Sequence, residues 1–527
     1  MRVGEAIAER LKELGVDTVF GIPGVHTIEL YRGIDRAGLR AITARHEQGA
    51  GFMADGYARV TGQPGVCVLI TGPGVTNALT PVAQAYHDSV PLLVLASTTA
   101  RRDLGRARGP LHDLPDQAEL ARGVTAFSET VLDPEDALSA LDRAWTAILA
   151  GRPRPAHLAV PVDVLGEECD APRGRASSKH SAAPEPAQVQ AAADLLARSE
   201  CPVILLGGGA VDVGEVAVEL ATLLDAPTAL TGNAKGAFPA SHPLCLGATL
   251  PFDSVQELLA DADVALLVGT ELSEVDVIYS GSPLRFGGAI VRVDVDPAQV
   301  SNGVAADAPV VGDAPASLQA LLAALRERGA ADRQHAAAQR VRGALAGITW
   351  TPESKLHMPW LDALDAALPA DRIVVLDSTK LAYTAHHYLD AERPRAWLAP
   401  YGYGTLGPAL PMAIGAKLGA PKRSVVAIAG DGGLLFTIAE LATAVDLQLP
   451  IPLVVWDNRG YDEIRDSFDR ARAPRIGTET TAHDLCAIAE GFGCHAALAH
   501  DPDALRAAVV AAFEADRPTL VRVPASD

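Results

Sequence analysis

The chain has 527 residues, 49% of them hydrophobic and 21% charged, with 47 Gly, 37 Pro and a formal net charge of −21. This composition is typical of an α/β protein of several domains, and the acidic balance disfavours nucleic acid or an anionic membrane as partner, because both require a basic face. Six cysteines without a CxxC pair indicate neither zinc nor a disulfide framework, and the absence of a targeting signal or an apolar run of about 18 residues predicts a cytoplasmic protein.

The first 165 residues alternate between helical and strand patterns. The sequence predicts helices at 3–14, from about 27 and through 53–60, and strands at 17–20, 39–44, 65–71 and 91–97. This alternation predicts a doubly wound parallel sheet. Three of the expected turns carry the motifs GIPG (21–24), RHEQGAG (45–51) and GPGVTN (72–77).

A second α/β region follows. Residues 166–187 are rich in Ala, Pro, Ser and charge and are predicted to be a linker. Residues 188–330 form the central domain, with strands at 201–206, 263–268 and 290–295. Its Gly207-Gly208-Gly209 is not followed by a GxGxxG pattern, so we interpret it as a strand-to-helix turn. The stretch 324–348 is rich in Ala and Arg and predicts a helix that connects the central region to the third. We give this connector the bounds 331–354.

The third region, 355–527, contains a β-α-β unit that organises the rest. Strands at 424–429 and 451–456 end in the turns GDGG (430–433) and DNRG (457–460). The crossover places both turns at the carboxyl edge of a parallel sheet, so Asp431 and Asn458 should converge. Their carboxylate and amide oxygens suit Mg²⁺. In the helix that follows, we expect Ile464 to pack inward.

Several motifs, in this order, resemble the acetolactate synthase and 2-oxo acid decarboxylase group of thiamine diphosphate (ThDP) enzymes. They are GIPG (21–24), TARHEQGAGFMADGYAR (43–59), TGPGVTNA (71–78), GRPRPAHLAVPVDV (151–164), YGTLG (403–407) and the GDG motif. The resemblance implies three doubly wound α/β domains: pyrimidine-binding (1–165), central and Rossmann-like (188–330), and diphosphate-binding (355–527). It implies that Asp431, Asn458 and the Gly460 carbonyl hold Mg²⁺. Asp457 replaces a usual Asn at a position that is not normally a ligand.

The resemblance also assigns the activation of ThDP. Glu47 would bond N1′ of the aminopyrimidine and favour the imino tautomer, which removes the C2 proton of the thiazolium. Leu406 would wedge between the two rings and hold the cofactor bent, and the Gly404 carbonyl would accept a hydrogen bond from the 4′-amine. Taken alone, Glu47 is also compatible with a helix N-terminal acid beside His46.

Further residues occupy positions that contact cofactor or substrate in relatives. The cofactor contacts are Pro23, Asn77, Thr379, Lys380, Gly432 and Gly433, with Lys380 in place of a common Gln. His26, His112 and Gln117 would handle the 2-oxo acid; packing or surface roles are the alternative. Because Glu47 and Asp431 meet across a subunit interface in the family, a homodimer or homotetramer is implied.

Within the group, PGVHTIELYRG, LAYT and YGYGTLG are most similar to 5-guanidino-2-oxopentanoate (2-oxoarginine) decarboxylases. Acetolactate synthases are the alternative, although the helix after the metal turn lacks their Trp. A non-catalytic FAD- or nucleotide-binding module is a third interpretation, and the segment 227–239 leaves FAD binding open. Glu463, then Asp462, are the candidates for pairing with a substrate guanidinium, on the same helix as Asp466.

Overall fold

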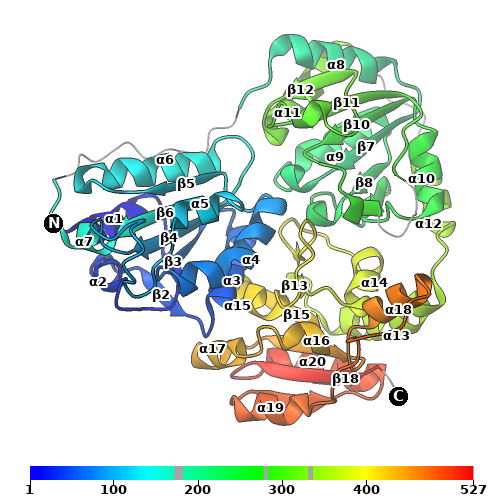
Figure 1. The fold of residues 1–527 in the computed structure, drawn as a ribbon. Helices are drawn as coiled ribbons and strands as arrows, with labels where there is room; N and C mark the ends of the chain where they lie inside the picture. The colour runs from blue at the N-terminus through cyan, green and yellow to red at the C-terminus, as the bar shows by residue number, and fades with distance from the viewer. Residues whose placement is uncertain (171–181, 278–282, 330–335, 526–527) are drawn as a thin grey trace. The chain divides into compact units, whose positions relative to one another are not determined.

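The computed structural model describes residues 1–170, 182–277, 283–329 and 336–525 (Figure 1). The described chain folds into two compact units. The first contains residues 1–170, 366–382 and 403–525, and the second contains 182–365 and 383–402. Part of the predicted linker (171–181) and part of the predicted connector (331–335) lie outside the described residues. In the ranges that are described, every helix is too short or too polar to cross a membrane.

The N-terminal part of the first unit is a six-stranded parallel sheet in the order β2-β1-β3-β4-β6-β5. Its strands are β1 (Thr18–Gly21), β2 (Arg40–Thr43), β3 (Gly65–Leu69), β4 (Leu92–Thr98), β5 (Phe127–Thr130) and β6 (Ala156–Pro161). Its helices are α1 (Val3–Glu13), α2 (Ile28–Ala37), α3 (Glu47–Thr61), α4 (Pro73–His87), α5 (Gln117–Arg122), α6 (Ala137–Leu149) and α7 (Val162–Gly166). The central strands β3, β4 and β6 are buried along their whole length, as expected when helices cover both faces.

The second unit contains another six-stranded parallel sheet, in the order β12-β11-β10-β7-β8-β9. Its strands are β7 (Pro202–Leu206), β8 (Thr228–Leu230), β9 (Cys245–Gly247), β10 (Val264–Val268), β11 (Ala289–Asp294) and β12 (Ala308–Val311). The accompanying helices are α8 (Pro186–Arg198), α9 (Glu215–Leu224), α10 (Asp253–Ala260), α11 (Ala314–Glu327) and α12 (Ala337–Ala346). A Cβ at Gly207 would lie 2.3 Å from the Gly269 carbonyl oxygen, so this glycine lets two strand ends approach closely.

The remaining elements follow in chain order. They are α13 (Pro352–Ala367), β13 (Arg372–Leu376), α14 (Lys380–Tyr388), β14 (Trp397–Leu398), α15 (Ala409–Gly419), β15 (Ser424–Gly430), α16 (Asp431–Leu434), α17 (Glu440–Asp446), β16 (Pro452–Asp457), α18 (Asp462–Arg470), α19 (Leu485–Gly491), β17 (His495–Leu498), α20 (Pro502–Phe513) and β18 (Thr519–Pro524). Short 3-10 helices lie at η1 (Pro134–Asp136), η2 (Gly208–Ala210), η3 (Gly232–Ala234), η4 (Glu274–Val277) and η5 (Gln299–Ser301). In the first unit, β13-β15-β16-β18-β17 are neighbours in a parallel sheet.

Helices α3 and α15 join the two sheets of the first unit (Figure 1). A Cβ at Gly56 would lie 2.2 Å from the Met412 carbonyl oxygen, and one at Gly415 would lie 1.9 Å from that of Met53. The helices therefore cross with their backbones in contact. The predicted α/β class with parallel sheets is confirmed, and the domain boundaries remain a prediction.

Candidate active site

The parallel strands β15 and β16 bring Asp431 and Asn458 together. They pair so that Gly430 lies opposite Trp456, and both therefore end at the same edge of the sheet. Asp431 Oδ2 accepts a hydrogen bond from the backbone nitrogen of Gly460 at 3.0 Å, and Oδ1 accepts one from that of Asn458 at 3.4 Å. The expected convergence of the two turns is confirmed.

The side-chain amide of Asn458 lies against two other oxygens. One of its terminal atoms is 3.1 Å from Asp431 Oδ1 and 2.9 Å from the Gly460 carbonyl oxygen. If this atom is the amide nitrogen, it donates hydrogen bonds to both oxygens. If it is the amide oxygen, it forms a group of three oxygens with Asp431 Oδ1 and the Gly460 carbonyl. Around an octahedral Mg²⁺ with bonds of about 2.0–2.1 Å, adjacent oxygens are about 2.9 Å apart. The three groups therefore fit Mg²⁺ in chemistry, and the two distances from the Asn458 amide match this spacing.

The surroundings of Asp431 disfavour the charged form of its carboxyl group. Burial and then the charge of Asp457 raise its pKa, against hydrogen bonds from nearby backbone N–H groups. A bound cation would favour the charged form instead. Asp457 itself accepts a hydrogen bond from Arg522 Nε at 2.7 Å, so its charge is balanced by β18. Across the described chain, no cluster of three or more His, Cys, Asp or Glu side chains could hold a metal.

The turn after β13 lies against the glycine turn. A Cβ at Gly433 would be 2.9 Å from Asp377 Oδ1, and one at Gly430 would be 2.9 Å from Thr379 Oγ1. Gly432 lies beside the Tyr461 ring in the same way. The predicted contacts Thr379, Gly432 and Gly433 thus lie around one turn.

Glu47 is the first residue of α3, and only 9% of it is exposed. His46 caps the helix, because its Nδ1 accepts a hydrogen bond from the backbone of Gln48 at 3.1 Å. Asn77 Nδ2 donates to Glu47 Oε2 at 2.9 Å. Asn77, expected as a cofactor contact, therefore orients the Glu47 carboxylate.

The loop that carries Leu406 is held on both sides. Asp377 accepts hydrogen bonds from the Gly407 backbone nitrogen at 3.0 and 3.1 Å, and Thr437 Oγ1 donates to the Gly407 carbonyl at 2.6 Å. On the other side, Thr405 Oγ1 donates to Gln84 Oε1 at 3.2 Å. Leu406 is half-buried, whereas Gly404 is exposed, with φ of +65°. Burial raises the pKa of Asp377 to about 7.

Sequence reasoning missed the roles of Asp377 and Gln84 as loop anchors. Asp377 directly follows a buried strand, which is a local signal for a residue at the ligand-binding edge. Gln84 has no such signal, since its partner Thr405 is 321 positions away in the chain.

The two predicted substrate histidines lie together, with ring centroids 5.4 Å apart in an edge-to-face arrangement. Burial, then His112, lowers the pKa of His26, whose buried Nδ1 meets no hydrogen-bond partner among the described residues. Gln117 is instead built into the core: its Oε1 accepts from Thr71 Oγ1 at 2.9 Å and its Nε2 donates to the Ser97 carbonyl at 3.0 Å. Pro23 is exposed in the turn after β1.

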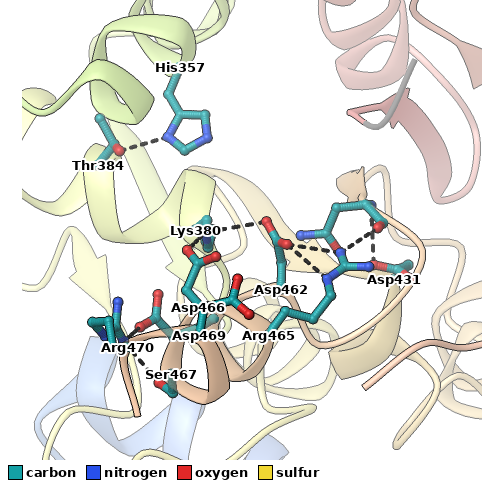
Figure 2. A network of polar contacts seen from close by, with 12 residues as sticks. His357, Lys380, Thr384, Asp431, Asp462, Arg465, Asp466, Ser467, Asp469 and Arg470 are labelled. Atoms are coloured by element: carbon teal, nitrogen blue, oxygen red, sulfur yellow. Dashed lines mark hydrogen bonds and ion pairs between the residues drawn. The ribbon is translucent and has the colours of Figure 1, made fainter. Parts of the chain in front are cut away.

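Lys380 points its ammonium at α18 (Figure 2). It is 7% exposed, forms an ion pair with Asp466 and lies 3.3 Å from Asp462 Oδ2. Arg465 Nε binds the other oxygen of Asp462 at 3.0 Å. The Lys380 charge is therefore already balanced by two carboxylates.

Glu463, on the same helix, has a side chain that is 34% exposed and pairs with Arg470 at 2.7 Å. The expectation that Ile464 packs inward is wrong, because 49% of this side chain is exposed. The helix has no buried residue, and ion pairs with Lys380 attach it to the rest of the unit.

Comparisons with known proteins agree along the whole chain. Residues 1–120 match the family described as thiamine pyrophosphate enzyme, N-terminal TPP binding domain; residues 189–321 match its central domain and residues 377–523 its C-terminal TPP binding domain. The chain is 41% identical over 528 residues to the probable 2-ketoarginine decarboxylase AruI of Pseudomonas aeruginosa, covering 99% of this chain and 94% of that protein. It is 31% identical over 563 residues to a probable acetolactate synthase large subunit of Methanocaldococcus jannaschii, covering 99% and 92%.

The fold is similar to that of a Mycobacterium smegmatis protein described as a thiamin diphosphate-dependent enzyme. The TM-score is 0.84 at 24% identity, with 100% of both chains covered. The fold, the three domain matches in chain order and the long relatives agree, and the chain belongs to the thiamine pyrophosphate enzyme family.

Proposed function

We propose that this chain is a ThDP- and Mg²⁺-dependent decarboxylase of a 2-oxo acid, with 5-guanidino-2-oxopentanoate as its substrate. The observation that carries the proposal is the convergence of the Asp431 carboxylate, the Asn458 amide and the Gly460 carbonyl beside the glycine turn. The name of the 41% identical relative, a probable 2-ketoarginine decarboxylase, supports the choice of substrate.

ThDP, when bound, supplies a nucleophilic carbon and an electron sink for the loss of CO₂. Asp431, Asn458 and the Gly460 carbonyl would hold Mg²⁺ and through it the diphosphate. Thr379 and the backbone of Gly432 and Gly433 would line the diphosphate. We assign Lys380 to the edge of this site, because its ammonium is shared between two carboxylates of α18.

Glu47 would hold and exchange a proton at N1′ of the aminopyrimidine. Asn77 supports this role, because it donates to Oε2 of the carboxylate, and Oε1 would then face the ring nitrogen. Leu406 would pack between the two rings, from a loop held by Asp377 and Gln84, and the Gly404 carbonyl would accept from the amine.

His26 and His112 would bind the carboxylate or carbonyl of the 2-oxo acid. Nδ1 of His26 has no partner among the described residues, and as an N–H donor it could bond a substrate oxygen. We assign Gln117 a supporting role, because both ends of its amide are used within the core.

Selectivity for a guanidinium would come from the carboxylates of α18. A planar guanidinium pairs with a carboxylate through two parallel hydrogen bonds. Glu463 is the stronger candidate, because its partner Arg470 is 64% exposed and such surface pairs contribute only about 0–1 kcal/mol. Asp462 is shared between Arg465 and Lys380, and so exchanges partners less readily.

The complete site would require two copies of the chain, with Glu47 of one and Asp431 of the other. The minimum assembly is then a homodimer with two sites, and a homotetramer is the usual larger form.

The deciding experiment measures kcat/KM for 5-guanidino-2-oxopentanoate, pyruvate and an apolar 2-oxo acid. We expect the wild type to prefer the guanidino acid and Glu463→Gln to lose most of that preference. Asp469→Asn is the matched control on the same helix, because Asp469 pairs with the exposed Arg475. A wild type that prefers pyruvate refutes the substrate; a Glu463→Gln variant with intact preference refutes only the role of Glu463.

The 31% identical relative favours acetolactate synthase activity as a second candidate. Formation of acetolactate from pyruvate, in place of an aldehyde from the guanidino acid, would support it.

Native mass spectrometry covers the remaining interpretation: bound ThDP fits both enzyme activities, whereas flavin without ThDP would favour a nucleotide-binding module. Flavin together with ThDP would identify FAD as an additional ligand.

A further inference from the structure

The carboxylate of Glu440 is buried at the N-terminus of α3, although the residue belongs to α17. Its Oε1 accepts hydrogen bonds from the backbone nitrogens of Arg45 at 3.1 Å and His46 at 3.0 Å. Oε2 lies 3.2 Å from the Arg45 nitrogen and accepts from Thr443 Oγ1 at 2.6 Å. These two backbone groups immediately precede Glu47.

The chain also leaves room for this carboxylate. A Cβ at Gly49 would lie 2.1 Å from Glu440 Oε1 and 2.5 Å from its Cδ. A real Cβ cannot occupy that space, so any side chain at position 49 would displace the carboxylate. Gly49 and Glu440 are therefore complementary in shape as well as in polarity.

A buried carboxylate is an unusual means of joining two segments. Burial raises the pKa of Glu440, while the hydrogen bonds from Thr443, Arg45 and His46 lower it. The charge also lies at the positive end of the α3 dipole, which favours an anion. If this contact served only to hold the two segments together, apolar side chains could do so without the free-energy cost of removing a charge from water.

The same two segments are joined a second time at the surface. Arg45 forms an ion pair with Asp446, whose side chain is 62% exposed. Exposed pairs of this kind contribute little to stability. The surface pair connects the segments without touching the backbone before Glu47, and it is therefore a natural control for the buried contact.

We infer that Glu440 is a positioning residue that fixes the first turn of α3 and thereby the direction of the Glu47 carboxylate. The inference rests on the proposed role of Glu47 in activating the cofactor. Asn77 holds the Glu47 side chain from one side, and Glu440 holds the backbone from which that side chain extends. Without Glu440, the N–H groups of Arg45 and His46 would lose their acceptor, and the first turn would sample other conformations.

The test compares Glu440→Ala, Glu440→Gln and Asp446→Asn with the wild type. In the cofactor-free protein, we expect amide hydrogen exchange in peptides covering residues 44–50 to rise on the order of tenfold or more in Glu440→Ala. In the ThDP complex, we expect C2–H/D exchange measured by NMR to slow by roughly tenfold, while ThDP affinity from calorimetry changes little. Glu440→Gln, which keeps one acceptor oxygen, should recover part of both effects, and Asp446→Asn should show neither.

Gly49→Ala tests the same contact from the other side. It should reproduce the faster amide exchange and slower C2 exchange, because its methyl group displaces the carboxylate. The double variant Glu440→Ala/Gly49→Ala should be no worse than the worse single variant, since the cavity left by Glu440 accepts the methyl group. If Glu440→Ala fails to fold, Gly49→Ala and Glu440→Gln carry the test.

Normal C2 exchange in both Glu440→Ala and Gly49→Ala would overturn the inference, even if the amides of 44–50 exchanged faster. Glu47→Gln is the reference: it should slow C2 exchange by roughly 10²-fold while retaining ThDP. If Glu47→Gln has no effect on C2 exchange, the proposed role of Glu47 fails, and with it the reason to orient it. If only the Glu440 and Gly49 variants lack an effect, the role of Glu47 stands and the positioning inference alone is wrong.

Discussion

At the scale of single residues, Asp431 and Asp457 show how the surroundings separate two neighbouring carboxylates. Asp457 pairs with Arg522, whereas Asp431 is buried against backbone N–H groups and the Asn458 amide. We expect Asp431→Ala to abolish ThDP binding in the presence of Mg²⁺, because a ligand of the metal is lost. Calorimetric titration measures this, with Asp457→Asn as the control that retains binding. Unchanged affinity in Asp431→Ala would remove the residue from the metal site.

A second residue-scale prediction concerns pH. His157 is fully buried in β6, and burial lowers its pKa to about 4, while Ser128 Oγ lies 2.9 Å from its Nδ1. An unfolded chain has a histidine pKa of about 6.5. As the pH falls below about 6.5, the unfolded chain therefore takes up the proton first, and the free energy of unfolding decreases by up to roughly 3 kcal/mol by about pH 4.

The change that tests this is His157→Gln, which cannot be protonated. Thermal melting between pH 7.5 and 4.5 should show a Tm that falls less steeply in the variant than in the wild type. The variant should have the lower Tm at pH 7.5, because its side chain fits the site less well. Parallel pH profiles would show that protonation of His157 does not limit acid stability.

At the scale of elements, the strands, their turns and the helix α18 were predictable, but the way α18 packs was not. Parallel strands covered on both faces, such as β15 and β16, are continuous apolar runs that end at glycine or asparagine. The ends of these strands define the edge of the sheet at which Asp431 meets Asn458. The polar pattern of α18 shows no apolar face, and the expectation that Ile464 packs inward was wrong.

Contacts between distant elements are the other part that the sequence could not reveal. Glu440 contacts Arg45 and His46, which are 395 and 394 positions away in the chain. Asp377 contacts the backbone of Gly407, 30 positions later in the chain. Neither pair belongs to a local pattern of hydrophobicity or capping. Only tertiary packing, such as that of α3 against α15, brings such groups together.

The ionic attachment of α18 leads to a prediction for this element. Lys380→Met should leave Asp462 and Asp466 facing each other without the buried ammonium. Like charges then repel, and α18 should detach more often. Hydrogen exchange in peptides covering 461–470 should become faster, and salt should accelerate the same peptides in the wild type more than in the variant. Equal exchange in both proteins would mean that other contacts hold α18.

At the scale of the whole molecule, the proposed sharing of sites between copies is testable by mixing inactive variants. Neither Asp431→Ala nor Glu47→Gln should be active alone. In a mixed dimer, one site would combine Asp431 from one copy with Glu47 from the other and would be intact. Random reassociation should therefore restore about a quarter of the wild-type activity.

The control for this experiment mixes each variant with itself under the same dissociation conditions. Recovery only in the cross-mixture supports sites shared between copies. Absence of recovery, when sedimentation shows that mixed dimers have formed, would place Glu47 and Asp431 of each site in the same chain.

The close crossing of α3 with α15 has a consequence for the order of synthesis. Thr61 ends α3 and Ala409 begins α15, and all segments of the second unit lie between them in the chain. At translation rates of about 5–20 residues per second, roughly 20–70 s pass before α15 leaves the ribosome. During that interval the nascent N-terminal sheet exposes the glycine-lined surface of α3, and we expect chaperones to bind it until the last quarter of the chain emerges.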